Sequence, residues 1–209
     1  MTSRGQFITL EGIEGAGKST MVTFITDLLT QSGREVVVTR EPGGTLIGEQ
    51  LREILLDKTN DELTDDTELM IIFAARSQHL EQVIKPALDQ GKDVLCDRFT
   101  DASFAYQGGG RGMDSTRIET LETWVQQGIR PDLTLLFDLE VSVGLQRASK
   151  RSEADRFERE HIDFFERTRQ CYLERARAEP ARFATVDAEN DIESVQAQIR
   201  QILASRQLC

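Results

Sequence analysis

A glycine-rich run near the N-terminus carries residue types that bind phosphate. Residues 12–19 read GIEGAGKS and satisfy the pattern GxxxxGK(S/T). In such a loop the backbone N–H groups close around a phosphate, Lys18 reaches the β- and γ-phosphates, and Ser19 offers a hydroxyl to Mg²⁺. The run lies between an apolar stretch and an amphipathic one, as this mechanism requires. The predicted nucleotide-binding positions are Gly12, Ile13, Glu14, Gly15, Ala16, Gly17, Lys18, Ser19 and Thr20.

Several classes of protein use such a loop. A GTPase switch needs NKxD and DxxG, but neither Asn60 nor Asn190 precedes a lysine, and no aspartate is followed by glycine three positions on. A mechanical ATPase usually has a longer chain, and a regulatory protein that uses ATP as a switch stays open. A small-molecule kinase needs a second anion site with arginines for its acceptor.

Candidates for that second anion site follow a later apolar run. Asp97, Arg98 and Phe99 come directly after residues 93–96, so in a parallel sheet they emerge at the same edge as the glycine-rich loop. Asp97 could hold Mg²⁺ through water or position an acceptor, and Arg98 could clasp its phosphate; the two could instead form a structural ion pair. Arg76 lies among apolar neighbours and needs an anion, either the substrate or a nearby carboxylate.

The elements that must position these residues alternate along the chain. Five short apolar runs, at 6–10, 35–39, 93–96, 133–139 and 183–186, are separated by amphipathic stretches. This alternation is typical of βαβ units, and it predicts an α/β fold with a five-stranded, mostly parallel sheet flanked by helices.

Helical spacing and capping residues predict the principal helices. One covers 18–32 and ends at Gly33. A second opens at Asp65, with Glu68 completing a capping box, and is kinked or interrupted at Pro86. A third runs from Asp114 to Gly128 with Ile118, Leu121, Trp124 and Val125 facing inward, and a fourth is capped by Asn190 with Glu193. Residues 107–112, QGGGRG, are expected to form a flexible loop.

Composition limits the classes of partner. The 209 residues carry a net charge of −11, with 39% hydrophobic and 29% charged residues, which is typical of a soluble globular protein. This balance argues against nucleic-acid and membrane partners. Cys96, Cys171 and Cys209 form no CxxC pair, and a reducing cytoplasm is the simplest location. Without a linker or repeat, residues 1–209 are expected to form one domain.

Taken together, the chain resembles the bacterial thymidylate kinase family nearly from end to end. The match consists of EGIEGAGKS at 11–19, TREPGGT at 39–45, FAAR at 73–76, DRF at 97–99 with Ser103, AYQGGGRG at 105–112 and an arginine-rich stretch at 147–156. The resemblance implies a P-loop NTPase fold with a short lid, at about 147–160, and transfer of the γ-phosphoryl of ATP to dTMP, giving dTDP for dTTP synthesis. It also implies Mg²⁺ and a homodimer.

The resemblance also implies roles for individual residues. Arg76, Arg98 and Arg52 would hold dTMP, with Arg76 and Arg98 at its phosphate and the catalytic site and Arg52 lining the acceptor pocket. Tyr106 would lie beneath the deoxyribose, where its ring resists a 2′-hydroxyl. The further substrate positions are Glu14 near the 3′-hydroxyl, Glu41 in the second motif, and Ser103 and Gln107 at the thymine ring. The stacking phenylalanine of many members lies four residues before the arginine, but here Ile72 has that place, and Phe73 becomes the candidate.

The same family pattern assigns the catalytic charges. The loop offers no basic residue between Ile13 and Gly17, so the resemblance places the catalytic arginine in the lid, as Arg147 or Arg151, with Lys150 and Arg156 as further candidates. Lys18, Arg98 and Asp97 complete the predicted catalytic set, and Ser19 and Asp97 the predicted metal site. Gathering basic residues in one cleft predicts a sharply positive pocket on a negative body.

Overall fold

A computed structural model describes residues 4–60, 62–150 and 155–208. Its five strands are β1 (Phe7–Glu11), β2 (Val36–Arg40), β3 (Asp93–Asp97), β4 (Leu133–Asp138) and β5 (Phe183–Asp187). They form one sheet in the order β2-β3-β1-β4-β5, and every adjacent pair is parallel. The five apolar runs are therefore strands, and the predicted parallel α/β fold is confirmed.

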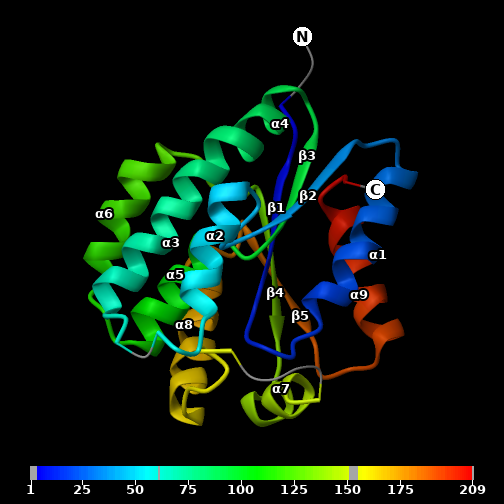
Figure 1. Cartoon of the computed structure of the whole chain (residues 1–209). Coiled ribbons are helices and arrows are strands. Elements are labelled where there is room, and N and C mark those ends of the chain that lie inside the picture. The colour runs from blue at the N-terminus through cyan, green and yellow to red at the C-terminus, as the bar shows by residue number, and fades with distance from the viewer. Residues whose placement is uncertain (1–3, 61, 151–154, 209) are drawn as a thin grey trace.

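Helices cover both faces of this sheet. Those in the described part of the chain are α1 (Lys18–Gln31), α2 (Leu46–Leu56), α3 (Asp65–His79), α4 (Lys85–Asp89), α5 (Thr100–Ser103), α6 (Ser115–Gln126), α7 (Val141–Ala148), α8 (Ile162–Ala178) and α9 (Ile192–Ser205), with π-helical segments η1 (Leu80–Ile84) and η2 (Phe104–Gly110). Figure 1 shows α1 and α9 on one face and α3, α6 and α8 on the other. Among the residues described, no helix is long and apolar enough to cross a membrane.

The central strands are buried because both faces are covered. Every residue of β1 is buried, and Ile8 and Leu10 join Ile25 of α1 and Leu135 of β4 in the largest apolar cluster. The register pairs Leu10 of β1 with Asp97 of β3. The loops after β1 and β3 therefore leave the sheet side by side at one edge.

Three details of the predicted helices differ. The box of Asp65 with Glu68 is wrong, because Thr64 caps α3 by accepting a hydrogen bond from the Thr67 N–H, and Glu68 is fully buried. The last helix is capped by Asp191, one residue after the predicted cap. Helix α2 was not predicted; several of its apolar residues are exposed, so its pattern gives a weak signal.

The structure also tests the predictions made for Pro86, for Trp124 and for residues 107–112. The helix before Pro86 changes to π-helical hydrogen bonding in η1, as the expected interruption requires. Trp124, predicted to face inward, is 74% exposed. The expected loop at 107–112 is also wrong in part, because residues 107–110 belong to η2. A Cβ on Gly110 would lie 2.4 Å from the Phe164 ring, so this glycine permits close packing against α8 rather than a flexible turn.

Candidate functional site

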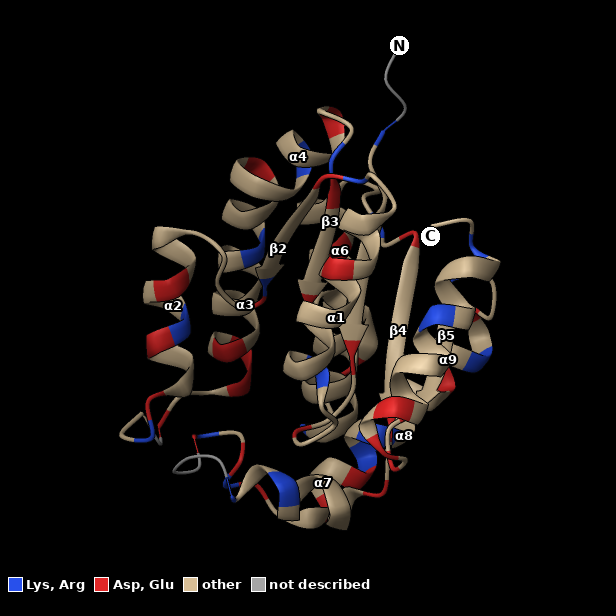
Figure 2. Ribbon diagram, turned by 90° about the vertical axis from the view of Figure 1, so that its right-hand side faces the viewer, with Lys and Arg blue, Asp and Glu red and all other residues tan. Residues whose placement is uncertain are grey.

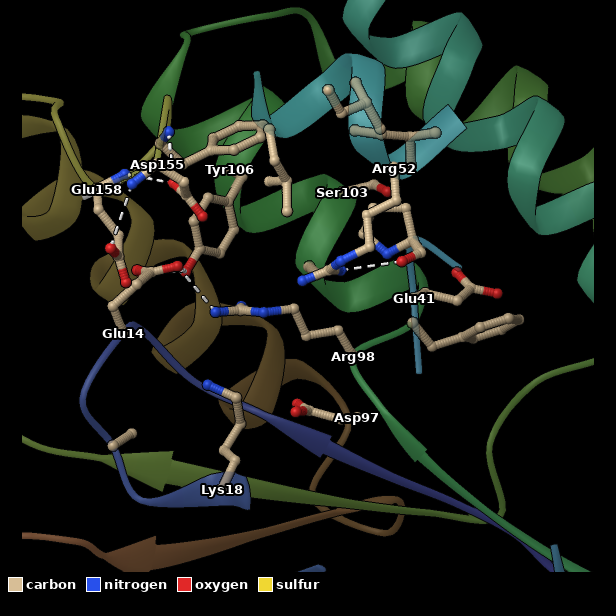
Figure 3. A pocket seen from close by; sticks show the side chains of 18 of the residues that line it. Glu14, Lys18, Glu41, Arg52, Asp97, Arg98, Ser103, Tyr106, Asp155 and Glu158 are labelled. Carbon is tan, nitrogen blue, oxygen red and sulfur yellow. Dashed lines mark hydrogen bonds and ion pairs between the residues drawn. The ribbon is translucent and has the colours of Figure 1, made fainter. Parts of the chain in front are cut away.

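A cavity of about 250 Å³ opens at the edge of the sheet where β1 and β3 end. The loop before α1, the end of β3, helices α2 and α3, segment η2 and residues 155–158 all contribute to its wall (Figure 3). Among the residues described, its charged lining comprises Lys18, Arg52, Arg76 and Arg98 together with Glu14, Glu41, Asp97, Asp155 and Glu158.

This lining corrects the prediction of a sharply positive pocket. Basic residues gather there as expected, but a slightly larger number of carboxylates gathers with them. Burying guanidinium groups without partners is costly, and the carboxylates offset that cost. Along α2, Figure 2 shows a basic residue, Arg52, between the acidic residues Glu49 and Glu53.

The glycine-rich loop lies between β1 and α1, as predicted. Gly15 has φ of +73°, and a Cβ there would lie 1.9 Å from the carbonyl oxygen of Gly144 in α7, so only glycine fits. Residues 14–19 line the cavity. Of the other predicted positions, Gly12 and Ile13 are buried behind the loop, and Thr20 lies one residue beyond it.

Lys18 is buried at the start of α1. Its Nζ donates hydrogen bonds to the carbonyl oxygens of Gly12, at 2.8 Å, and Ile13, at 3.0 Å. Burial, with a smaller contribution from the nearby Arg98, lowers the pKa of Lys18 to about 8. The ammonium group is thereby fixed at the cavity wall, and an anion bound there would favour its charged form.

Asp97 and Ser19 both line the cavity. Asp97 ends β3, and its Oδ1 is buried with no hydrogen-bond partner among the described residues. Ser19 is exposed at the first turn of α1. A carboxylate oxygen with free lone pairs and a hydroxyl that line the same cavity are a donor set that suits Mg²⁺. The predicted metal residues therefore fit the ion.

Arg76 enters the cavity from α3 and is almost completely buried. Its Nε donates to Glu41 at 2.7 Å and its Nη2 to Ser103 at 3.1 Å. Its Nη1 is buried and has no partner among the residues described. The arginine thus has a protein carboxylate as its counter-ion and one N–H direction left for a further anion.

Glu41 is held by two partners at the end of β2. Besides Arg76, it accepts a hydrogen bond from Nδ1 of His79 at 2.9 Å, whose Nε2 lies 2.6 Å from the Thr39 hydroxyl. Burial raises the pKa of Glu41, but Arg76 and His79 outweigh burial, so the pKa lies below its usual value. Sequence reasoning missed His79, although it lies three residues after Arg76 and so shares a helix face with it.

Arg98, which directly follows β3, also lines the cavity. Its Nη2 donates to Glu14 at 2.9 Å, its Nη1 to the Tyr172 hydroxyl at 3.3 Å, and its guanidinium lies 4.7 Å above the ring of Tyr106. The Tyr106 hydroxyl in turn donates to both oxygens of Glu14 at 2.8 Å. The ion pair of Arg98 is therefore with Glu14, and Asp97 is left for other ligands.

The remaining acceptor positions also reach the cavity, with one exception. Arg52 donates to the Pro42 carbonyl at 2.9 Å, and Ser103 and Gln107 line the wall. Phe73 does not, since it packs with Leu69 and Phe104 in a core cluster and lies 4.5 Å from the Arg76 guanidinium. The neighbouring Ile72 faces the cavity instead.

The basic residues that were predicted to supply the catalytic charge from the lid lie in different surroundings. Arg147 donates to the carbonyl oxygens of Ala188 and Glu189, at 2.7 and 3.2 Å, and does not line the cavity. Arg156 donates to Glu68 and to the Leu55 carbonyl. Lys150 is exposed, and Arg151 lies outside the described residues. From the segment predicted as a lid, Asp155, Phe157 and Glu158 line the cavity.

Glu11 is a buried carboxyl that sequence reasoning missed. It accepts hydrogen bonds from the Phe99 N–H and from the Tyr172 hydroxyl, each at 2.7 Å. Burial and the nearby Asp101 raise its pKa to about 8. Glu11 ends β1 immediately before the glycine-rich loop. A carboxyl group at the end of an otherwise apolar strand is the sequence feature that could have identified it.

Comparison with known proteins agrees with this geometry. A family model described as thymidylate kinase matches residues 10–199. A thymidylate kinase of Alcanivorax borkumensis is 55% identical over 203 residues, covering 97% of this chain and 98% of that protein, and one of Pseudomonas putida GB-1 is 56% identical over 199 residues, covering 95% of each. The crystal structure of thymidylate kinase from Ehrlichia chaffeensis superposes with a TM-score of 0.79 at 31% identity, covering 96% of this chain and 99% of that one. This chain belongs to the thymidylate kinase family and has its P-loop NTPase fold.

Proposed function

We propose that this cavity binds ATP at the P-loop and dTMP at the arginine-lined wall opposite, so that the γ-phosphoryl passes between them. Phosphorylation of dTMP to dTDP is the activity of the family to which the chain belongs. The observation that carries the assignment is that Lys18 and Arg76, whose Nη1 has no hydrogen-bond partner among the described residues, line the same cavity. Two anion-binding groups on separate elements suit two phosphorylated substrates.

Phosphoryl transfer from ATP to dTMP requires mainly that the protein position the two substrates. The acceptor oxygen of dTMP is already an anion, so no general base is required at neutral pH, and transfer depends on alignment and charge neutralisation. Lys18 and the loop amides would hold the ATP phosphates. Ser19 and Asp97 would hold Mg²⁺, which neutralises charge on the phosphates.

On the acceptor side, three of the proposed dTMP-binding side chains are held in place by hydrogen bonds to a neighbouring carboxylate. Arg76 and Arg98 are oriented by Glu41 and Glu14, so both can meet the dTMP phosphate without reorganising. Arg52 approaches from α2. Tyr106, whose hydroxyl donates a hydrogen bond to Glu14, would lie against the deoxyribose and exclude the 2′-hydroxyl of a ribonucleotide.

The base would lie between η2 and α3. Ser103 and Gln107 would contact its polar edge, and Ile72 would cover the place that Phe73 was predicted to fill. Among the lid candidates, Arg151 stays a prediction for the charge on the transferring phosphoryl group, and Arg147 could act there only after leaving the two carbonyl groups it now binds. Turnover of Arg151→Ala and Arg147→Ala variants tests both; normal turnover would exclude the residue concerned.

An acceptor panel tests the function. ADP release from ATP is measured with dTMP, dUMP, UMP, CMP, AMP, GMP and thymidine in turn. We expect dTMP to give the highest kcat/KM, and preference for another acceptor would overturn the assignment. ADP release that no acceptor changes would instead favour a regulatory ATP-binding protein.

We also propose a homodimer, a property that the family resemblance implies. Exposed apolar side chains on α2 and α3, namely Leu46, Ile47, Ile54 and Met70, support it. Analytical ultracentrifugation tests it, and a monomer at micromolar concentration would contradict it. A cytoplasmic location, supported by the free thiols of Cys96 and Cys171, is proposed with it.

A further inference from the structure

We propose that Glu68 is a positioning residue for recognition of the acceptor base, acting by fixing the orientation of the Gln107 amide. Glu68 does not line the cavity, whereas Gln107 does. The inference rests on the proposed contact between Gln107 and the base of dTMP.

Glu68 is a fully buried carboxylate with three side-chain partners from two other segments. It accepts a hydrogen bond from Nε2 of Gln107 at 2.8 Å and one from Nη2 of Arg111 at 3.2 Å, and it also pairs with Arg156. With two guanidinium partners it is a carboxylate that only accepts hydrogen bonds. The side of Gln107 that faces it must therefore be the NH₂ group.

This constraint determines what Gln107 offers to a ligand. In a planar amide the oxygen lies on the opposite side of the carbon from the nitrogen, so the oxygen of Gln107 is directed away from Glu68 as an acceptor. Thymine carries an N–H at N3, whereas cytosine has an unprotonated acceptor nitrogen there. An amide held with its oxygen toward the base therefore favours dTMP over dCMP, and a freely rotating amide does not.

Arg111 and Arg156 connect Glu68 to residues 155–160, at the end of the predicted lid. Arg156 also donates through Nε to the carbonyl of Leu55, at 2.8 Å, and Leu55 lines the cavity. Arg111 pairs with Glu160 as well. Glu68 thus joins α3 and η2 to the segment from 155 to 160, and a purely structural role for this cluster is the alternative to be tested.

The test compares Glu68→Gln with Asp66→Asn, which makes the same chemical change at an exposed position of the same helix. Initial rates give kcat/KM for dTMP and dCMP and the KM for ATP. We expect the dTMP/dCMP ratio to fall about tenfold in Glu68→Gln, the effect of about one hydrogen bond, with the KM for ATP unchanged. Asp66→Asn should keep the wild-type ratio. A wild-type ratio in Glu68→Gln would overturn the proposal.

A second variant covers the case in which Glu68→Gln does not fold. Glu68→Asp keeps the charge beside both arginines but shortens the side chain, so it separates the carboxylate from Gln107. Its dTMP/dCMP ratio should fall as well, and a wild-type ratio in the folded variant would overturn the proposal.

A double-mutant cycle separates this inference from the proposed base contact. Gln107→Ala should lower the dTMP/dCMP ratio, and adding Glu68→Gln should lower it no further, because Glu68 acts through Gln107. If Gln107→Ala leaves the ratio unchanged, the base contact and this inference both fail. If Gln107→Ala lowers the ratio but Glu68→Gln does not, or if the two effects add fully, only this inference fails.

Discussion

The two walls of the cavity are built in different ways. The donor wall is one stretch of chain, residues 14–19, whose lysine is bound by carbonyl groups of its own loop. The acceptor wall is assembled from α2, α3, η2 and the residue that follows β3, and two of its arginines, Arg76 and Arg98, are paired with carboxylates from other segments. A local loop can form its phosphate site from backbone geometry alone, whereas the acceptor site depends on tertiary packing to orient each guanidinium group.

Because of this difference, we expect that a substitution can disrupt binding at one wall without disrupting binding at the other. A change in the loop should affect ATP, and a change among the arginines should affect dTMP.

Replacing the loop lysine should have the largest effect. Lys18→Met removes the charge on the ATP phosphates, and we expect kcat/KM to fall on the order of 10²–10³-fold, as when one preorganised donor to transition-state charge is lost. A coupled ADP-release assay measures it. Lys92→Met, which removes a lysine from a surface pair with Glu35, is the control and should behave as wild type. A loss below about tenfold in Lys18→Met would contradict the donor assignment.

On the acceptor wall, Arg76→Lys should have the next largest effect. Lysine keeps the charge beside Glu41 but loses the planar geometry that contacts Glu41, Ser103 and a further anion together. We expect the KM for dTMP to rise about 10- to 100-fold, the effect of one hydrogen bond to a charged group, with the KM for ATP little changed. Arg117→Lys, on an exposed pair with Asp66, is the control. Equal changes in both KM values would show that the walls are not separate.

The same contrast explains what could be predicted from the sequence. The strands, α1 and the P-loop were predictable, because their signals lie in consecutive residues. The partners of Arg76 were not, since Glu41 and Ser103 are 35 and 27 residues away in the chain. The resemblance indicated most of the residues that gather in the cavity, Phe73 and Arg147 excepted, but not that carboxylates would balance the arginines.

Choosing between Ile72 and Phe73 also needed tertiary information. Both are apolar and adjacent on one helix, and only the packing of α3 shows which of them faces the cavity. Likewise, the glycines of η2 resemble a loop in sequence, and their packing against α8 becomes visible only when the two segments are placed together.

A pair of variants at these adjacent positions should give a smaller effect. Ile72→Ala removes apolar contact with the base, and we expect the KM for dTMP to rise about three- to tenfold, equivalent to one or two buried methylene groups. Phe73→Leu should instead lower the free energy of unfolding by about 1 kcal/mol and leave that KM unchanged. Kinetics and urea unfolding measure the two. If Phe73→Leu raises the KM for dTMP more than Ile72→Ala does, the original stacking prediction is restored.

At Glu11, which does not line the cavity, the expected effect is on the pH dependence of the free energy of unfolding. Its pKa is raised from 4.5 to about 8 in the folded state, so the folded protein binds the extra proton between these values. The stability that this group contributes is fully present below pH 4.5 and is lost as the pH rises through about 8.

Glu11→Gln lacks this titration and provides the comparison. The free energy of unfolding of the wild type minus that of Glu11→Gln should fall between pH 5 and pH 8, by at most about 1.4 kcal/mol per pH unit. Urea unfolding at several pH values measures the difference. A difference that does not vary with pH would contradict the raised pKa.

The separation of the two walls is tested most directly by calorimetric titration of dTMP and of a non-hydrolysable ATP analogue into the wild type, Lys18→Met and Arg76→Lys. We expect Lys18→Met to bind the ATP analogue at least tenfold more weakly while keeping the wild-type Kd for dTMP, and Arg76→Lys to show the reverse. If either variant weakens both ligands to the same extent, the two anion sites are not built independently.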